Sequence, residues 1–214
     1  MTAATVSDFV HVHVPPARGV TDPRTVLLLH GTGGNERDLL ALGAQIAPGV
    51  RLLGVRGQVM EGGLPRFFRR LAEGVFDEAD IVTRAADLSA FVRSAATTYG
   101  FDATQVVALG FSNGANIAAA MLLLHPGVLA GAILLRTMVP LHPAALPSLD
   151  GVPVLMAEGT LDPIVPRANA ERLAALLGET GAMVTLHWEP AGHGLTQGDV
   201  DASRTFFAAG GRTA

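Results

Sequence analysis

The sequence contains no cysteine, which excludes disulfide bonds, thiolate metal sites and a cysteine nucleophile. The redox environment of the protein is therefore left open. Lysine is missing as well, so all 15 basic residues are arginine, which we interpret as a compositional bias. With a net charge of -4, the chain has no basic surface of the kind that binds nucleic acid or an anionic membrane. Neither is expected as a partner.

Long apolar runs are absent too. The longest, such as IAAAMLLL at 117–124, are far shorter than the roughly 20 residues that a membrane-spanning helix needs. The first residues, MTAATVSDFVHVHV, lack the basic region followed by an apolar core that marks a signal peptide. We therefore expect no membrane partner and a cytoplasmic location.

What the chain does have is apolar content. Hydrophobic residues make up 49% of its 214 residues and charged residues only 16%, which is typical of a compact globular protein and not of a disordered one. A chain of this length can bury its apolar surface in one core. Since no repeat, low-complexity tract or linker divides it, we expect a single domain over 1–214.

Short apolar runs typical of strands alternate with segments that have helical spacing. Strands are expected at Phe9–Val14, Thr25–His30, Arg51–Gly57, Gln105–Phe111, Gly131–Arg136, Val152–Gly159 and Met183–Glu189. Helices are expected at Glu36–Ile46, Ala79–Tyr99, Asn113–His125, Pro166–Gly178 and Thr196–Ala209. Several strands are apolar on both faces, as strands buried between helical layers are. The sequence therefore predicts a three-layer α/β domain, with a mostly parallel sheet and helices on both faces.

Local signals refine this picture. Asn35 and Thr196 are suited to N-cap a helix, and Gly100 is placed as a C-cap. The alternation of polar and apolar residues in FVHVHV predicts a strand at the edge of the sheet. The segment Arg56–Asp80 fits neither pattern. It follows the carboxyl end of a strand, where long insertions commonly shape a binding pocket.

The stretch ALGFSNGANIAAAMLLL places Ser112 in a Gly-x-Ser-x-Gly motif, after a strand pattern and before a helix pattern. This is the context of a nucleophile elbow, in which a strained turn exposes a serine at the N-terminus of a helix. Small residues are needed on both sides because the helix must pack close to the strand that it follows. The alternative is that Ser112 only caps the helix.

Two further side chains follow later strands in the order that a serine nucleophile needs. The loop GTLDPIVP supplies Asp162 as an acid, and the loop EPAGHGL supplies His193 as a base between two glycines. A serine hydroxyl requires such a base, and the base requires an orienting carboxylate. Glu158 is the alternative acid, but it lies nearer the end of its strand, so we favour Asp162.

The other histidines have simpler interpretations. His30 ends a strand and precedes a glycine-rich loop, which it is expected to fix in place. His125 closes a helix, where an imidazole can bind the last carbonyls. His11 and His13 share one face of the edge strand. A metal site there lacks a third ligand, so a solvated strand face is the better interpretation.

An oxyanion hole requires backbone amides that already point at the developing charge. In the elbow architecture one amide belongs to the residue after the nucleophile, here Asn113, and the other to a loop after an early strand. The loop HGTGG makes Thr32 the candidate for the second amide. A phosphate-binding loop is the rival interpretation, but the segment lacks both the Gly-Lys-Ser/Thr ending and the dinucleotide spacing.

Taken together, the motifs LLLHGTGGNERDLL, PRFFRRLAEGVFDEADI, GFSNGANIAAAMLL, GAILLRTMVP, GTLDPIVP and GHGL resemble those of the phospholipase/carboxylesterase family of α/β-hydrolases. The chain looks closest to small bacterial carboxylesterases grouped with hydroquinone and quinone catabolism, and it is similar to dienelactone-hydrolase-like proteins. The resemblance runs from about Phe9 to Phe207.

The resemblance implies a triad on Ser112, Asp162 and His193, oxyanion amides at Thr32 and Asn113, no cofactor, no large lid and often a homodimer. Two features depart from it. Many members have glutamine where this chain has Asn113, which leaves the amide role unchanged. True dienelactone hydrolases use a cysteine nucleophile, which this chain lacks.

We therefore expect a serine carboxylesterase that acts on small-molecule, short-chain esters. Phe67, Phe68 and Met138 are expected to line its pocket, and Arg66 or Arg69 could steer an acidic substrate or simply lie on the surface. The alternatives are an acyl-thioesterase, a lysophospholipase-type enzyme, a lactone or C–C hydrolase of aromatic catabolism, and a non-catalytic binding protein.

Overall fold

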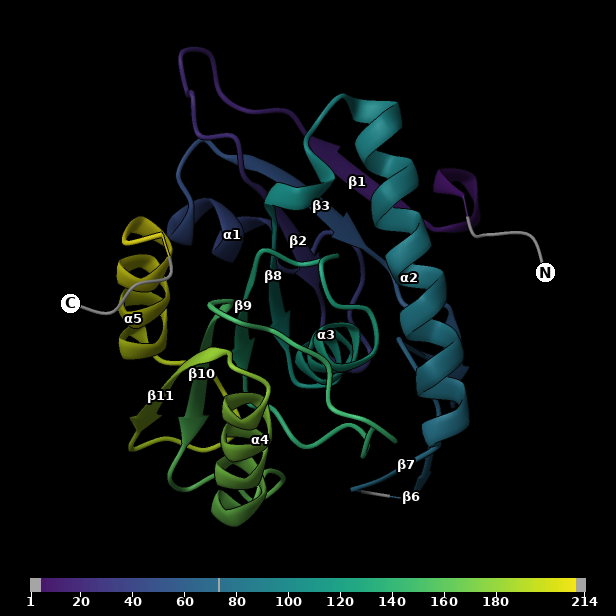
Figure 1. The fold of residues 1–214 in the computed structure, drawn as a ribbon, viewed down its shortest axis with the longest axis vertical. Coiled ribbons are helices and arrows are strands. Elements are labelled where there is room, and N and C mark those ends of the chain that lie inside the picture. The colour runs from purple at the N-terminus through teal and green to yellow at the C-terminus, as the bar shows by residue number, and fades with distance from the viewer. Residues whose placement is uncertain (1–4, 73, 211–214) are drawn as a thin grey trace.

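The computed structural model describes residues 5–72 and 74–210. In this range a seven-stranded sheet has the order β1-β3-β2-β8-β9-β10-β11 (Figure 1). Its strands are β1 (His11–Val14), β2 (Thr25–Leu29), β3 (Arg51–Val55), β8 (Val106–Phe111), β9 (Gly131–Leu135), β10 (Pro153–Gly159) and β11 (Met183–Glu189). β1 is antiparallel to β3, and all other neighbours are parallel. The edge position of the first strand and the mostly parallel sheet are as predicted.

Helices cover both faces of this sheet. They are α1 (Leu40–Ile46), α2 (Glu78–Tyr99), α3 (Asn113–Leu124), α4 (Arg167–Glu179) and α5 (Gln197–Ala208), with short 3₁₀ segments at Val6–Asp8 and Ala103–Gln105. The helices α1 and α5 lie together on one face, while α2, α3 and α4 cover the other (Figure 1). The predicted three-layer α/β architecture, with a mostly parallel sheet and helices on both faces, is confirmed.

The central strands divide their side chains between two cores because successive residues point to opposite faces. In β2, Leu27 and Leu29 pack under α2 and α3, whereas Val26 and Leu28 pack under α1 and α5. The same alternation continues through β8, β9 and β10. Strands that are buried on both sides read as apolar runs, which explains why these strands could be predicted from the sequence.

The order of the strands fixes where a site can form. From β2 the chain moves to β3 on one side and then returns to β8 on the other side of β2. Beyond the carboxyl ends of β2 and β8, the connections therefore leave in opposite directions and open a crevice between them. The glycine-rich loop after β2 and the turn at Ser112 after β8 meet there, because Leu29 pairs in register with Gly110.

The segment Arg56–Asp80, which matched neither pattern, contains two small hairpins. The first pairs β4 (Val59–Glu61) with β5 (Leu64–Arg66), and the second pairs β6 (Arg70–Ala72) with β7 (Val75–Phe76). Glu73 lies outside the described residues. In the part of the chain that the structure covers, no helix is long and apolar enough to cross a membrane.

Two of the three predicted caps are confirmed, and one is wrong. Thr196 caps α5 by accepting a hydrogen bond from the Asp199 amide, and Gly100 ends α2 with a φ of 65°. Asn35 does not cap a helix, because α1 begins only at Leu40. Its side chain accepts from the Arg37 amide at 2.9 Å and closes a local turn, which competes with the helical hydrogen bonds.

Candidate active site

The turn between β8 and α3 holds Ser112 in a strained conformation, with a φ of 53° and a ψ of -114°. Residues other than glycine rarely adopt a positive φ, and those that do are concentrated at functional sites. The neighbouring glycines make the turn possible. A Cβ on Gly114 would lie 2.0 Å from the Leu29 carbonyl oxygen, and one on Gly110 would lie 2.6 Å from the Gly114 carbonyl oxygen. The Ser112 side chain makes no capping hydrogen bond to α3, which counts against a role as a cap alone.

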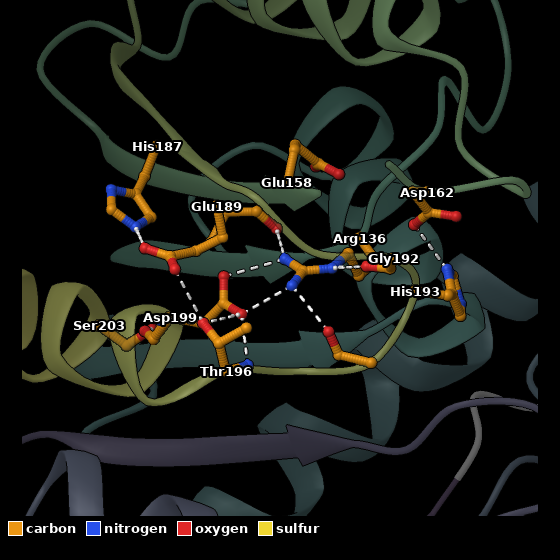
Figure 2. Close-up of polar contacts among 12 residues, drawn as sticks. Arg136, Glu158, Asp162, His187, Glu189, Gly192, His193, Thr196, Asp199 and Ser203 are labelled. Carbon is orange, nitrogen blue, oxygen red and sulfur yellow. Dashed lines mark hydrogen bonds and ion pairs between the residues drawn. The ribbon is translucent and has the colours of Figure 1, made fainter. Parts of the chain in front are cut away.

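The structure brings Ser112, His193 and Asp162 into one hydrogen-bonded row. The Nε2 atom of His193 lies 2.9 Å from Ser112 Oγ, and its Nδ1 atom lies 2.8 Å from Asp162 Oδ2 (Figure 2 shows the second contact). The loop after β11 carries His193, and the turn after β10 carries Asp162. Parallel strands end at one edge of the sheet, so three distant segments meet there.

The Asp162 carboxylate is held so that one oxygen faces the histidine. Its Oδ1 atom accepts hydrogen bonds from the amides of Ile164 and Val165, at 2.8 and 3.1 Å. The other oxygen is left for His193, and the carboxylate side chain has no exposed surface. A carboxylate placed in this way fixes both the tautomer and the orientation of an imidazole.

Glu158, the alternative acid, lies elsewhere. Both of its oxygens accept from the Thr137 amide, at 2.9 and 3.1 Å, and among the described residues it makes no hydrogen bond to His193 (Figure 2). Burial raises the pKa of Glu158 to about 8, although the Thr137 hydrogen bond and the Arg136 charge act in the opposite direction. This geometry favours Asp162 as the partner of the histidine.

The two expected oxyanion donors line the same cavity as Ser112 and His193. Within residues 5–72 and 74–210, the backbone amides of Thr32 and Asn113 have no acceptor, so both are available to a bound anion. Side chains hold both segments in place. Arg66 donates to Thr32 Oγ1 at 2.7 Å, and the Phe67 amide donates to Asn113 Oδ1 at 2.7 Å.

His30 fixes the loop that carries Thr32, as predicted. Its Nδ1 atom lies 2.6 Å from the Gly31 carbonyl oxygen, while its Nε2 atom accepts from the Gly57 amide at 3.0 Å. Burial lowers the pKa of this histidine, which favours the neutral ring that these two bonds require. It therefore ties the loop after β2 to the segment after β3.

The cavity over Ser112 has a volume of about 240 Å³. Its apolar walls include Phe76, Phe111, Met138 and Ile164. Met138 lines the cavity, as expected. The expectation that Phe67 and Phe68 also line it was wrong. They are 3% and 0% exposed and pack in the core beneath the hairpins, where the rings of Phe68 and Phe76 form a T-shaped pair. The insertion does shape the cavity through Phe76, a side chain that no sequence pattern had indicated.

Two arginines give the cavity wall its charge, and the described lining residues include no carboxylate. Arg66 is almost fully buried, while Arg70 is more exposed, and both pair with Glu61, at 3.3 and 2.6 Å. Burial lowers the pKa of Arg66, although a guanidinium remains charged. Arg69 points elsewhere, to Asp77. Of the two arginines that the sequence suggested for the site, Arg66 therefore lines the cavity and Arg69 does not.

A larger hollow of about 550 Å³ lies between Arg24, Gly131, Pro153 and Phe207. It is at the amino ends of β2, β9 and β10, the edge of the sheet opposite Ser112. Sites in open α/β sheets form at the carboxyl ends of strands. This hollow contains none of the candidate residues, so the smaller cavity is the better candidate for a reactive site.

The remaining histidines are packed into the structure. His11 binds the Tyr99 hydroxyl at 2.6 Å, and His13 stacks on the Tyr99 ring, so the expected solvated face is in fact covered by the end of α2. The expected contact between the His125 ring and the last carbonyls of its helix is not formed, and its buried Nε2 atom has no hydrogen-bond partner among the described residues. The described residues include no group of three or more possible metal ligands.

A sheet of parallel strands, a serine on a sharp strand-to-helix turn, and an acid and a histidine on later strand ends are the defining features of an α/β-hydrolase. Comparison with known proteins narrows the class. The family model of the phospholipase/carboxylesterase family matches residues 67–209, and the chain belongs to this family.

The MhqD protein of Bacillus subtilis (strain 168), which is named as a hydrolase, is 48% identical over 187 residues, covering 87% of this chain and 94% of MhqD. A Bacillus cereus carboxylesterase structure matches with a TM-score of 0.91 and 46% identity over 94% of both chains. The structure of YahD with malic acid matches with a TM-score of 0.87 and 28% identity, over 94% of this chain and 98% of YahD. The protein is an esterase-type serine hydrolase that acts on small-molecule esters.

Proposed function

We propose that the protein hydrolyses short-chain carboxylic esters through an acyl-enzyme, with Ser112 as nucleophile, His193 as base and Asp162 as the acid that orients the base. The observation that carries this proposal is the row of two hydrogen bonds from Ser112 Oγ through the His193 ring to Asp162. Such a row lets the imidazole accept the serine proton as the new bond forms.

The reaction proceeds in two halves. Ser112 Oγ attacks the ester carbonyl while His193 Nε2 takes its proton, and the amides of Thr32 and Asn113 stabilise the tetrahedral oxyanion. As the C–O bond breaks, His193 gives this proton to the departing alcohol. A water molecule then attacks the acyl-enzyme with the same histidine as base, which releases the carboxylic acid and restores Ser112.

The size of the cavity supports small substrates. Binding pockets for organic ligands commonly enclose roughly 300–1,000 Å³. The cavity over Ser112, at about 240 Å³, lies just below that range. The structure of a relative, YahD, with malic acid fits the same interpretation, because malic acid is a small compound.

Hydrolysis of 4-nitrophenyl esters from acetate to palmitate, with Ser112→Ala as the control, tests the proposal. We expect turnover that peaks at short acyl chains and falls to background in the alanine variant, while circular dichroism shows an unchanged fold. Activity that survives in a folded Ser112→Ala variant would refute the mechanism. A peak at long chains would refute the short-chain specificity and leave the mechanism intact.

The charged wall favours esters that carry a carboxylate elsewhere in the molecule. Among residues 5–72 and 74–210, Arg66 and Arg70 both pair with one acid, Glu61, so these residues leave positive charge at the cavity. We propose that monomethyl succinate is a better substrate than methyl pentanoate, a neutral ester of similar length. An ion pair at a partly exposed site is worth up to about 1 kcal/mol, which corresponds to about fivefold in kcat/KM.

A matched pair of variants tests this preference. Arg70→Gln should reduce the ratio of kcat/KM for the two esters, because the side chain lines the cavity. Arg69→Gln removes the same charge from the neighbouring position, where the side chain is exposed and pairs with Asp77, and should leave the ratio unchanged. Equal kcat/KM ratios in the wild type and both variants would rule out a carboxylate-binding role for Arg70.

A further inference from the structure

Among the residues that the structure describes, Arg136 has the largest fully buried side chain, and it follows β9 directly. Its backbone also has a positive φ, of 58°. A buried charge is costly unless it is paired and hydrogen-bonded, so a guanidinium in this position requires a dense set of partners. Nothing in the proposed reaction uses it directly.

The first partner is Asp199, in the first turn of α5. The two form a bidentate pair, with NH1 2.9 Å from Oδ1 and NH2 2.6 Å from Oδ2 (Figure 2). Burial alone would raise the pKa of Asp199, but the hydrogen bonds and charge of Arg136 hold it below its usual value. The pair is therefore charged, and it fixes the plane of the guanidinium.

The remaining donors of Arg136 reach the loop that carries the histidine. Its Nε atom donates to the Gly192 carbonyl at 3.1 Å, and its NH2 group donates to the Gly194 carbonyl at 2.8 Å. These two residues flank His193 directly in the sequence, and Figure 2 shows Gly192 and His193 near the guanidinium. A third bond, from NH1 to the Ala157 carbonyl at 2.9 Å, anchors the guanidinium to β10.

The loop needs such a restraint. Glycine has more backbone freedom than any other residue, so a histidine with glycine on both sides is poorly held by its own chain. We propose that Arg136, fixed by Asp199, is a positioning residue that clamps the backbone on both sides of His193 and so keeps its ring within hydrogen-bond distance of Ser112 and Asp162. The inference rests on the proposed function of these three residues.

The contrasting interpretation is that the pair only ties α5 to the sheet. Replacing both charges distinguishes the two, because neither charge is then left buried without its partner. In the Arg136→Met/Asp199→Leu variant the apolar contacts remain and the clamp is lost. A misplacement of about 1 Å near the reacting atoms can cost about 100-fold in rate.

The experiment measures kcat and KM for 4-nitrophenyl acetate, with the number of active sites taken from the burst of nitrophenol. We expect the double variant to fold but to unfold at a lower temperature, because the carbonyls of Ala157, Gly192 and Gly194 lose a donor. Its kcat per active site should fall about 100-fold, with KM changed less than about twofold. The control is Phe206→Leu, which alters the packing of α5 but not the clamp. It should lower stability and leave kcat unchanged.

A folded double variant with wild-type kcat would overturn the inference, as would a change confined to KM. If the double variant does not fold, Arg136→Lys serves instead, because a single ammonium cannot reach Asp199 and both glycine carbonyls. It should lose at least about tenfold in kcat with KM unchanged, and wild-type kcat would overturn the clamp.

The Ser112→Ala variant, assayed in parallel, separates this inference from the proposed function. If the Ser112→Ala variant is inactive while the Arg136 variants keep their activity, only the proposed positioning role of Arg136 is wrong. If the Ser112→Ala variant keeps its activity, the proposed mechanism itself is wrong.

Discussion

The buried carboxyl of Glu158 makes the stability of the protein depend on pH in a direction that can be worked out from the structure. Its pKa is about 8 in the fold, against an ordinary value of 4.5. Between these values the folded protein keeps a proton that the unfolded chain has released, so raising the pH favours unfolding. The slope for one group approaches about 1.4 kcal/mol per pH unit.

Replacement of Glu158 by glutamine removes this pH-dependent contribution to stability, while the glutamine carbonyl can still accept a hydrogen bond from the Thr137 amide. Relative to the wild type, Glu158→Gln should therefore gain about 2 kcal/mol in its free energy of unfolding as the pH rises from 5.5 to 7.0. Urea denaturation of both proteins at constant ionic strength measures this gain. The control is Glu171→Gln, an exposed acid of α4 paired with Arg167, for which the difference should stay constant.

A difference between Glu158→Gln and wild type that does not change over this pH range would refute the reasoning. It would mean that the carboxylate is ionised in the fold and balanced by Arg136. The same variant should also keep most of its turnover, because Glu158 does not contact His193.

Three further predictions concern the reactive turn and its cavity. Asp162→Asn should reduce kcat by about 10⁴-fold while the fold is retained, and a loss below tenfold would remove Asp162 from the mechanism. Gly114→Ala should cost about 3 kcal/mol in urea denaturation, because its Cβ would lie 2.0 Å from the Leu29 carbonyl oxygen; unchanged stability would contradict the close approach of α3 to β2. Met138→Ala should enlarge the cavity and move the preferred 4-nitrophenyl ester to a longer acyl chain, and an unchanged chain-length profile would exclude Met138 from the acyl site.

The elements of the sheet could be predicted because their signals are local. The strands β2, β8, β9 and β10 are buried on both faces, so each reads as a largely apolar run. The start of α1 could not be predicted in the same way. There the side chains of Asn35 and Asp38 bind nearby amides and close turns, an outcome that residue spacing alone does not reveal.

The expected pocket shows the same contrast. Phe67 and Phe68 are large and apolar and lie in an insertion, so they suited either a pocket wall or a core. The hairpins turn them inward and leave Phe76 at the cavity. Which of several apolar side chains faces a cavity depends on the path of the loop, and no periodic pattern records that path.

By itself, the sequence determined the order of the elements, the strained serine turn and the chain order of Ser112, Asp162 and His193. These features depend on local patterns, namely the Gly-x-Ser-x-Gly motif and the apolar runs of buried strands. Only the tertiary structure decided that Arg136 would meet Asp199, 63 residues further along the chain, and hold the carbonyls beside His193. The physical reason is that a buried charge is tolerated only where distant segments supply its partners, and the packing of the whole chain brings those segments together.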